Sequence, residues 1–218
     1  MNIVSQNPSN EVHGLTISQD AKGLEAFLNP SSAASIWRRD MPEGVQAWLT
    51  ALPSENLPTG RVVMPIKSAR TIATELFDMA HTPASAARDW LLNDLADLAQ
   101  TFGRLIATTY IRLRLEVVET NSCRKFHLDA IRARLICTYC GTGTQYGTAN
   151  GKVDPQQIFT VPTGHPMLLR GSLWPPQPAS GLVHRSPPIE GTGETRLILV
   201  LDPIKDPENE AHRDQVLH

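Results

Sequence analysis

Cysteine is scarce in this 218-residue chain, and long apolar runs and a large net charge are missing as well. Three cysteines cannot all pair with one another, which excludes a dense disulfide scaffold and is typical of a reducing compartment. Because no run of about 18 apolar residues is present, the sequence predicts no membrane-spanning helix. The opening residues also lack the basic-then-apolar order of a signal peptide. Together these absences predict a cytoplasmic protein with no membrane partner.

The small net charge of −2 limits the kinds of partner that the protein can attract. A broad, nonspecific attraction to nucleic acid needs a strongly positive surface, which this balance does not supply. Nucleic acid is therefore a disfavoured partner, although a local basic groove would still permit it. No period of 20–50 residues repeats, which argues against a solenoid or a propeller. The substrate, small or macromolecular, and the oligomeric state are not written in the sequence.

The chain divides into stretches of different composition. Residues 1–35 are polar and contain scattered Pro, Ser and Asn, which predicts an irregular N-terminal extension. Residues 36–206 are expected to form a single domain, with helical support over 36–105 and a β-barrel core over 106–206. Residues 207–218 form a polar C-terminal tail.

A long amphipathic helix is predicted at the end of the helical support. Thr82 fits its N-cap, and apolar residues recur at helical spacing over 90–102. Carboxylates on such a helix usually face water, and this is expected for Asp89, Asp94 and Asp97.

The second half of the chain has the pattern of short antiparallel strands. Apolar runs separated by Gly- and Pro-rich turns predict strands over 110–119, 126–140, 157–162, 166–170, 181–184 and 195–202. The predicted fold class is α+β with a mainly β core, a double-stranded β-helix of the jelly-roll or cupin-like type with supporting N-terminal helices. Within 110–119, alternation places aliphatic residues on one face and Arg112, Arg114 and Glu116 on the other. That charged face is interpreted as a solvated outer face, with a groove for an anionic substrate as the alternative.

Candidate metal ligands come from two of the predicted strands. His127 and Asp129 form an H-x-D pair, and His184 follows 57 positions after His127. Side chains two apart on an extended strand point to the same side, so the pair can reach one ion. Two imidazoles and one carboxylate with open coordination positions suit non-haem Fe(II) and oxygen chemistry. A second H-x-D pair, His212 and Asp214, lies in the polar tail and is interpreted as solvated.

Arg196 is the candidate for binding an anion near this metal. It stands 12 residues past His184, where a returning strand could direct its guanidinium into the same cavity. A planar, permanently charged fork suits bidentate binding of a carboxylate. The pattern of H-x-D, a distal His and a following Arg resembles the Fe(II)/2-oxoglutarate-dependent oxygenase superfamily. The resemblance implies iron binding by the His-Asp-His trio, binding of the distal carboxylate of 2-oxoglutarate by Arg196, and hydroxylation or demethylation of a substrate.

Three more residues are candidates for the cofactor site. Thr138 and Tyr139 follow the first predicted ligand strand, where their hydroxyl groups could hydrogen-bond a bound oxoacid, although such residues are also common in strands. Arg134 has two interpretations, a contact with substrate or cosubstrate and a cross-strand ion pair.

A narrower resemblance covers roughly residues 30–203. Its segments are IWRR at 36–39, FHLDAIRARLICTYCGTGT at 126–144, LLRGSLWP at 168–175, VHRSPP at 183–188 and RLILVLD at 196–202. These segments resemble a bacterial family known as domain of unknown function 1826. The family name implies no reaction, so the resemblance supports the site without naming a substrate. Gln145 and the Gly-rich stretch around it depart from the expected pattern, which concerns the rim of the pocket.

Two other functions remain open from the sequence. A cupin-like metal-dependent dioxygenase or isomerase would use the same ligands without 2-oxoglutarate, and Arg196 would then bind an anionic substrate directly. A noncatalytic metal-binding or regulatory protein would bind zinc tightly and turn over nothing. Cys137 and Cys140 have the C-x-x-C spacing of zinc and redox sites, but free cysteines in strands are usually core residues and no second pair follows.

Overall fold

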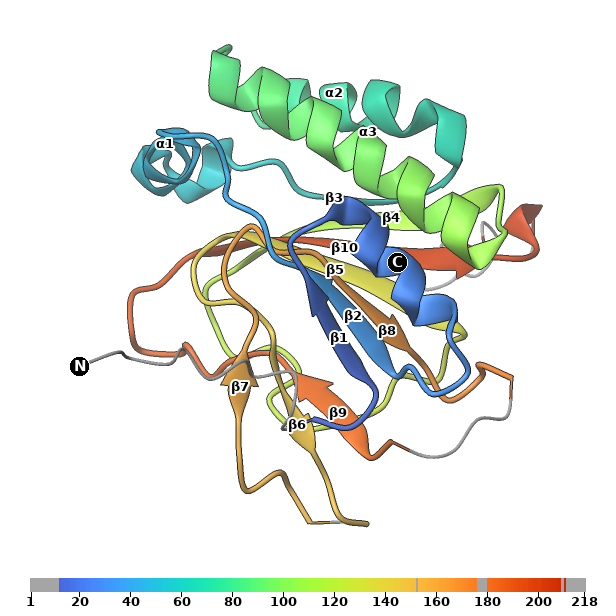
Figure 1. Ribbon diagram of the computed structural model, residues 1–218. Helices are drawn as coiled ribbons and strands as arrows, with labels where there is room; N and C mark the ends of the chain where they lie inside the picture. The colour runs from blue at the N-terminus through green and yellow to red at the C-terminus, as the bar shows by residue number, and fades with distance from the viewer. Residues whose placement is uncertain (1–11, 152, 176–179, 209, 211–218) are drawn as a thin grey trace.

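A seven-stranded sheet organises the molecule, in the order β1-β2-β8-β5-β10-β4-β3 (Figure 1). The computed structural model describes residues 12–151, 153–175, 180–208 and 210. β1 and β2 are parallel, and the other neighbours in this sheet are antiparallel. The strands are β1 Leu15–Ser18, β2 Ala34–Trp37, β3 Gly60–Pro65, β4 Tyr110–Val118, β5 Ala133–Cys140, β8 Met167–Arg170 and β10 Arg196–Ile204.

Helices cover one face of the large sheet, and a small sheet lies against the other (Figure 1). The small sheet has the order β7-β6-β9, with β6 at Gln145–Thr148, β7 at Phe159–Thr160 and β9 at Leu182–Arg185. The α-helices are α1 Val45–Ala51, α2 Ala69–Met79 and α3 Ala86–Ile106, and the 3-10 segments are η2 Ala21–Leu28, η3 Ser54–Asn56 and η4 Ile66–Ser68. None of the helices in the described part of the chain is long and apolar enough to cross a membrane. The predicted mixture of helices with a mainly β core is confirmed.

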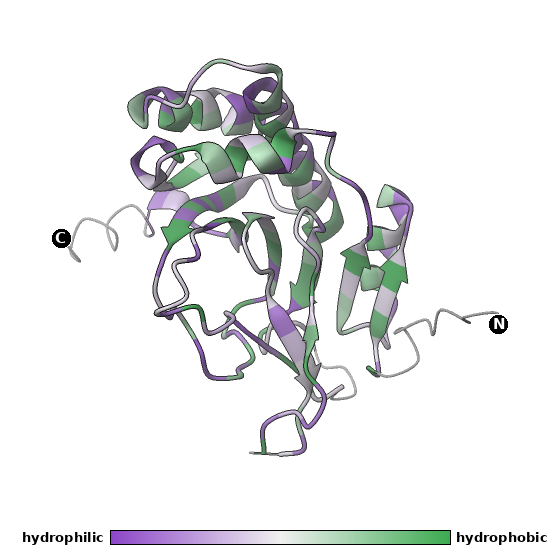
Figure 2. Cartoon of the chain, turned by 90° about the vertical axis from the view of Figure 1, so that its left-hand side faces the viewer, coloured by the Kyte–Doolittle hydropathy of each residue, from purple (hydrophilic) through white to green (hydrophobic). Residues whose placement is uncertain are grey.

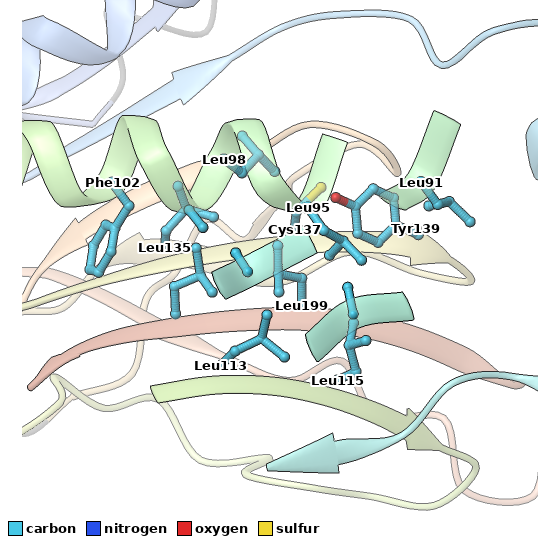
Figure 3. Close-up of a cluster of buried hydrophobic side chains, with 14 of the residues drawn as sticks. Leu91, Leu95, Leu98, Phe102, Leu113, Leu115, Leu135, Cys137, Tyr139 and Leu199 are labelled. Atoms are coloured by element: carbon cyan, nitrogen blue, oxygen red, sulfur yellow. The ribbon is translucent and has the colours of Figure 1, made fainter. Parts of the chain in front are cut away.

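Alternation along the central strands separates two apolar layers. Leu113, Leu135 and Leu199 point from β4, β5 and β10 toward α3, where they pack with Leu95 and Phe102 (Figure 3). The residues between them on the same strands point to the opposite face of the large sheet, because successive side chains of a strand lie on opposite faces. Figure 2 shows the resulting mixture of hydrophobic and hydrophilic residues along the strands.

A smaller apolar cluster fills the space between the two sheets. Ile136 and Val200 of the large sheet contribute to it, together with Tyr146 and Leu182 of the small sheet. This cluster keeps the small sheet in place over β5 and β10, and the candidate site lies in the same layer.

The expected irregular extension over residues 1–35 is wrong where the structure describes it. Residues 15–18 and 34–37 are strands of the large sheet, and β2 pairs with β8. Between the two strands, Leu24 and Phe27 of η2 are fully buried in the main core. Residues 1–11 lie outside the described residues, as does the tail from residue 211 onward with His212 and Asp214.

The long helix begins later than predicted, and one of its carboxylates is buried. Ser85 rather than Thr82 caps α3, because the Ser85 hydroxyl accepts a hydrogen bond from the backbone N–H of Arg88. Asp89 and Asp97 are exposed as expected, but Asp94 is not. Its carboxylate forms a two-pronged ion pair with Arg39 and accepts a hydrogen bond of 2.6 Å from the Tyr139 hydroxyl.

We expect Asp94→Asn to lower the free energy of unfolding by about 1.5–3 kcal/mol, the range for a buried hydrogen bond to a charged group. The substitution keeps the shape of the side chain but leaves the guanidinium of Arg39 without a counter-charge. Urea unfolding monitored by circular dichroism measures the change. Asp97→Asn on the exposed side of α3 is the matched control and should alter stability by less than about 0.5 kcal/mol. Equal effects of the two substitutions would contradict this account of Asp94.

Candidate metal centre

His127 and His184 are held opposite each other by their own backbones. The N–H of each residue donates to the carbonyl oxygen of the other at 3.0 Å, which forms an isolated antiparallel bridge. Residues paired in this way project their side chains to the same side of the ladder. The two ring centroids are accordingly 4.5 Å apart. His184 lies on β9 as predicted, but the strand expected over 126–140 forms only from residue 133. His127 is therefore positioned by the bridge to His184 and not by a continuous strand.

Asp129 lies between the two imidazoles. Its Oδ1 is 3.4 Å from Nε2 of His127, and its Oδ2 is 3.2 Å from Nε2 of His184. One ligand atom from each of the three residues lies within 4.8 Å of the others. Ligand atoms bound at about 2.0–2.2 Å to a common ion are roughly 3–4.4 Å apart, and the two distances from Asp129 to the imidazoles fall within this range. Among the described residues this is the only such group of three or more His, Cys, Asp or Glu side chains.

Hydrogen bonds, neighbouring charges and burial determine the protonation of these three side chains. The Nδ1–H of His127 donates to the Lys125 carbonyl oxygen at 2.9 Å, which leaves the lone pair of the neutral ring on Nε2. The neighbouring Asp129 carboxylate raises the pKa of His127, and burial lowers the pKa of His184. Burial acts to raise the pKa of Asp129, but the nearby imidazoles and the charge of Arg134 outweigh it and hold that pKa well below its usual range. Asp129 is therefore an ionised carboxylate.

One oxygen of Asp129 tests whether a metal ion fits. Oδ2 is buried and has no hydrogen-bond partner among the residues that the structure describes. A buried carboxylate oxygen without a partner is energetically costly, and a divalent cation bound to it would remove that cost. Two nitrogen donors and one oxygen donor suit Fe(II) as well as several other divalent metals. The residues present therefore fit a divalent metal ion.

Arg196 lies in the wall of the same cavity. A space of about 110 Å³ is lined by residues of both sheets, among them the three candidate ligands and Arg196. The Arg196 side chain is 1% exposed, and its Nε donates to the Thr142 carbonyl oxygen at 2.6 Å. Its buried Nη1 has no hydrogen-bond partner in the described part of the chain. Burial lowers the pKa of Arg196 to about 10, so the guanidinium remains charged at neutral pH.

Gly141 makes room for Arg196. A Cβ atom at residue 141 would lie 2.8 Å from Cγ of Arg196, and the backbone there has a φ of +76°. Both the close approach and the left-handed backbone require glycine. This accounts for the first glycine of the CGTGT segment.

The other predicted cofactor residues divide between the two faces of β5. Arg134 is on the cavity side and donates to Asp202 of β10 and to Asp129 Oδ1, each at 2.7 Å, so the interpretation as a cross-strand ion pair describes its observed contacts. Thr138 pairs with Ile198 on the cavity side of β5, and its buried hydroxyl has no partner among the described residues, although it does not line the cavity. Tyr139 points to the helices, where its hydroxyl donates to Asp94. The predicted contact of Tyr139 with an oxoacid is therefore wrong, because strand alternation directs it to the opposite face.

Sequence reasoning missed part of the cavity wall. Arg114 and Glu116 were expected on a solvated face but line the cavity, and Arg114 pairs with Glu116 at 3.0 Å and with Asp202 at 3.5 Å. The sequence patterns predicted no function for Asp202. The sequence did contain a signal for Asp202. It follows Arg196 by an even number of residues on β10, so the two side chains lie on the same face of the strand, and it is the one acid in a run of aliphatic residues.

The cysteines of the C-x-x-C pair are core residues. Cys137 and Cys140 are both buried in the cluster beneath the helices, and both are free. Burial raises the pKa of Cys137 to about 12, which keeps its thiol protonated and poorly reactive. Neither belongs to the His-Asp-His group.

The fold is similar to several solved oxygenase structures at low sequence identity. One is the dioxygenase for auxin oxidation 1 from Arabidopsis thaliana, in a binary complex with 2-oxoglutarate, at 10% identity over 88% of this chain and 92% of that chain with a TM-score of 0.49. Another is the rice dioxygenase for auxin oxidation, at 12% identity over 79% and 73% with a TM-score of 0.45. A prolyl-4-hydroxylase from Pseudomonas putida matches at 14% identity over 77% and 97% with a TM-score of 0.36. No curated protein matches the chain.

A family model covers most of the chain and includes every residue of the site. It is described as a protein of unknown function, DUF1826, and it matches residues 18–202. The matched region runs from the end of β1 to Asp202 near the end of β10 and contains the candidate ligands and Arg196. The chain therefore belongs to the DUF1826 family.

Proposed function

We propose that this protein is an oxygenase, a hydroxylase or demethylase, that uses Fe(II) and 2-oxoglutarate. The observation that carries the proposal is the meeting of two unlike groups in one cavity. His127, Asp129 and His184 converge as a metal-binding set, and the guanidinium of Arg196 lies in the same wall with a free donor. A metal ion beside a buried, permanently charged fork suits a cosubstrate that chelates a metal at one end and carries a carboxylate at the other.

The arrangement of the sheets supports the same proposal. We infer that the large sheet and the β7-β6-β9 sheet are the two sheets of a double-stranded β-helix, with their shared apolar cluster as its interior. His184 belongs to the small sheet and Arg196 to the large one. A site built between two sheets draws its groups from both, which is how residues 12 positions apart come to face one cavity.

The protein groups have separate tasks in this proposal. The two imidazoles and the ionised Asp129 hold the metal, and Arg196 binds and orients the distal carboxylate of 2-oxoglutarate. Fe(II) with bound 2-oxoglutarate supplies the activation of O2 that hydroxylation requires. Ile136, Ile198 and Val200 line the cavity and exclude water from it.

The small size of the cavity supports a substrate that remains outside it. Pockets that enclose a drug-sized molecule usually measure about 300–1,000 Å³, whereas this one measures about 110 Å³. We propose that it holds the small oxoacid and leaves no space for a drug-sized substrate beside it. The His127 side chain is 33% exposed while that of His184 is 6% exposed, so the substrate is proposed to approach from the side of His127.

The test is an anaerobic titration of the metal-free protein with Fe(II) and then with 2-oxoglutarate. We expect a weak visible metal-to-ligand charge-transfer band that needs both additions, because it arises only when the oxoacid chelates the iron. Iron binding without the band would contradict the use of 2-oxoglutarate and favour the cupin-like dioxygenase or isomerase. Tight zinc binding with no iron binding would contradict the oxygenase and favour a noncatalytic metal-binding protein.

A further inference from the structure

We propose that Arg134 is a positioning residue that determines which oxygen of Asp129 binds the metal, and that Asp202 holds Arg134 in place for this task. The inference rests on the proposed function, because it concerns the same metal centre. It adds a residue, Asp202 on β10, that is not itself a candidate metal ligand.

The two oxygens of Asp129 have different surroundings. Oδ1 accepts a hydrogen bond from Nη1 of Arg134 at 2.7 Å. Oδ2 has no hydrogen-bond partner among the described residues and lies 3.2 Å from Nε2 of His184. A carboxylate oxygen engaged by a cation is a weaker ligand for a second cation, so the metal is directed to Oδ2. Binding through one oxygen leaves more coordination positions for the cosubstrate than binding through two.

Asp202 fixes the guanidinium that makes this distinction. Nε and Nη2 of Arg134 donate to the two oxygens of Asp202 at 2.7 and 3.0 Å. The register of β5 and β10, with Leu135 opposite Leu201, places Arg134 and Asp202 directly across from each other. The pair is shielded from solvent, since the two side chains are 17% and 7% exposed. A two-pronged pair at this exposure holds one orientation of the guanidinium.

Only a planar guanidinium can make both contacts. One edge, Nε and Nη2, meets Asp202, and the remaining nitrogen, Nη1, reaches Asp129. A lysine ammonium carries the same charge on a single nitrogen and cannot repeat this geometry. A lysine at position 134 would therefore keep the positive charge but lose the fixed orientation of the donors.

The experiment measures Co(II) binding to the metal-free protein by isothermal titration calorimetry, together with the visible absorption of the Co(II) complex. The variants are Arg134→Lys, Arg134→Met and Asp202→Asn. Asp94→Asn is the matched control, because Asp94 is an equally buried carboxylate in a two-pronged pair with an arginine, on the opposite face of the sheet. Thermal unfolding of each metal-free variant measures its folding independently of the metal.

We expect Arg134→Met and Asp202→Asn to weaken Co(II) binding by about 10–100-fold, the range for residues that orient metal ligands, and Arg134→Lys to recover only part of the affinity. The visible absorption bands of the Co(II) complex should also lose intensity in these variants. An Asp129 carboxylate that binds through both oxygens raises the coordination number of the metal. Asp94→Asn should lower stability but leave Co(II) affinity and spectrum within about twofold of the parent.

Two outcomes would overturn the inference in different ways. If the parent binds Co(II) and Asp202→Asn binds it equally well with the same spectrum, the role of Asp202 and Arg134 is wrong while the metal centre stands. If Asp202→Asn does not fold, Arg134→Lys decides the same question, because full affinity in that variant also contradicts the inference. If the parent binds no Co(II), both the proposed function and the inference are wrong.

Discussion

Replacing His184 by alanine is expected to weaken binding of Fe(II) or Co(II) by roughly 10²–10³-fold and to abolish the proposed oxygenase activity. Protein sites with four ligands bind divalent zinc with about 10–16 kcal/mol, so one ligand contributes about 2.5–4 kcal/mol. His184 is 4% exposed, and its Nε2 lies 3.2 Å from Asp129 Oδ2, so the substitution removes a buried nitrogen donor from the candidate metal centre. Calorimetric titration of the metal-free variant measures the loss.

A control must separate lost coordination from lost folding. His165 is a second buried histidine, 8% exposed, in the turn before β8 and outside the candidate metal group. His165→Ala should reduce stability by an amount similar to His184→Ala but leave metal affinity unchanged. If both variants lose metal equally, the effect is one of folding; if neither loses it, His184 is not a ligand.

The three residues that meet at the candidate metal centre could be predicted from the sequence, although the local structure that brings them together could not. The H-x-D spacing, the distal histidine and the following arginine are all visible in the sequence. Strand alternation predicts that the H-x-D pair shares one side of a strand, but His127 lies before β5 and is held by two backbone hydrogen bonds to His184. A bridge between residues 57 apart is a tertiary feature that a local pattern does not encode.

The same limit explains the two larger errors in the fold. β1 and β2 are four-residue strands that become strands by pairing with each other and, for β2, with β8 far along the chain. Their sequences, LTIS and ASIW, are too short for a local pattern to predict this. Asp94 resembles any carboxylate of an amphipathic helix until Arg39, 55 residues earlier, is brought against it. In contrast, β4 and β10 were predicted within two residues of their ends, because their alternation and apolar content are local properties.

Replacing Arg196 by methionine is expected to weaken binding of 2-oxoglutarate by about 30-fold or more, and up to several thousand-fold, while Fe(II) still binds. Removing one partner of a buried charge pair costs about 2–5 kcal/mol, which corresponds to this range. Methionine keeps much of the volume of the arginine stem, so the packing around Gly141 and Thr142 is largely preserved. The measurement is the concentration of 2-oxoglutarate that half-saturates the charge-transfer band of the iron-loaded protein.

Arg185 provides the matched control for the loss of a positive charge. It lines the same cavity, but its guanidinium is occupied, since Nε donates to Gln145 at 2.8 Å and the group stacks on Phe126 at 4.4 Å. Arg185→Met should therefore change the half-saturating concentration by less than about threefold, because only a guanidinium with a free donor gains a new bond from the carboxylate. Equal weakening by both substitutions would mean that the cavity attracts the oxoacid by its overall charge. Unchanged binding in Arg196→Met would remove Arg196 from the cosubstrate site altogether and return it to a structural role, anchored to Thr142.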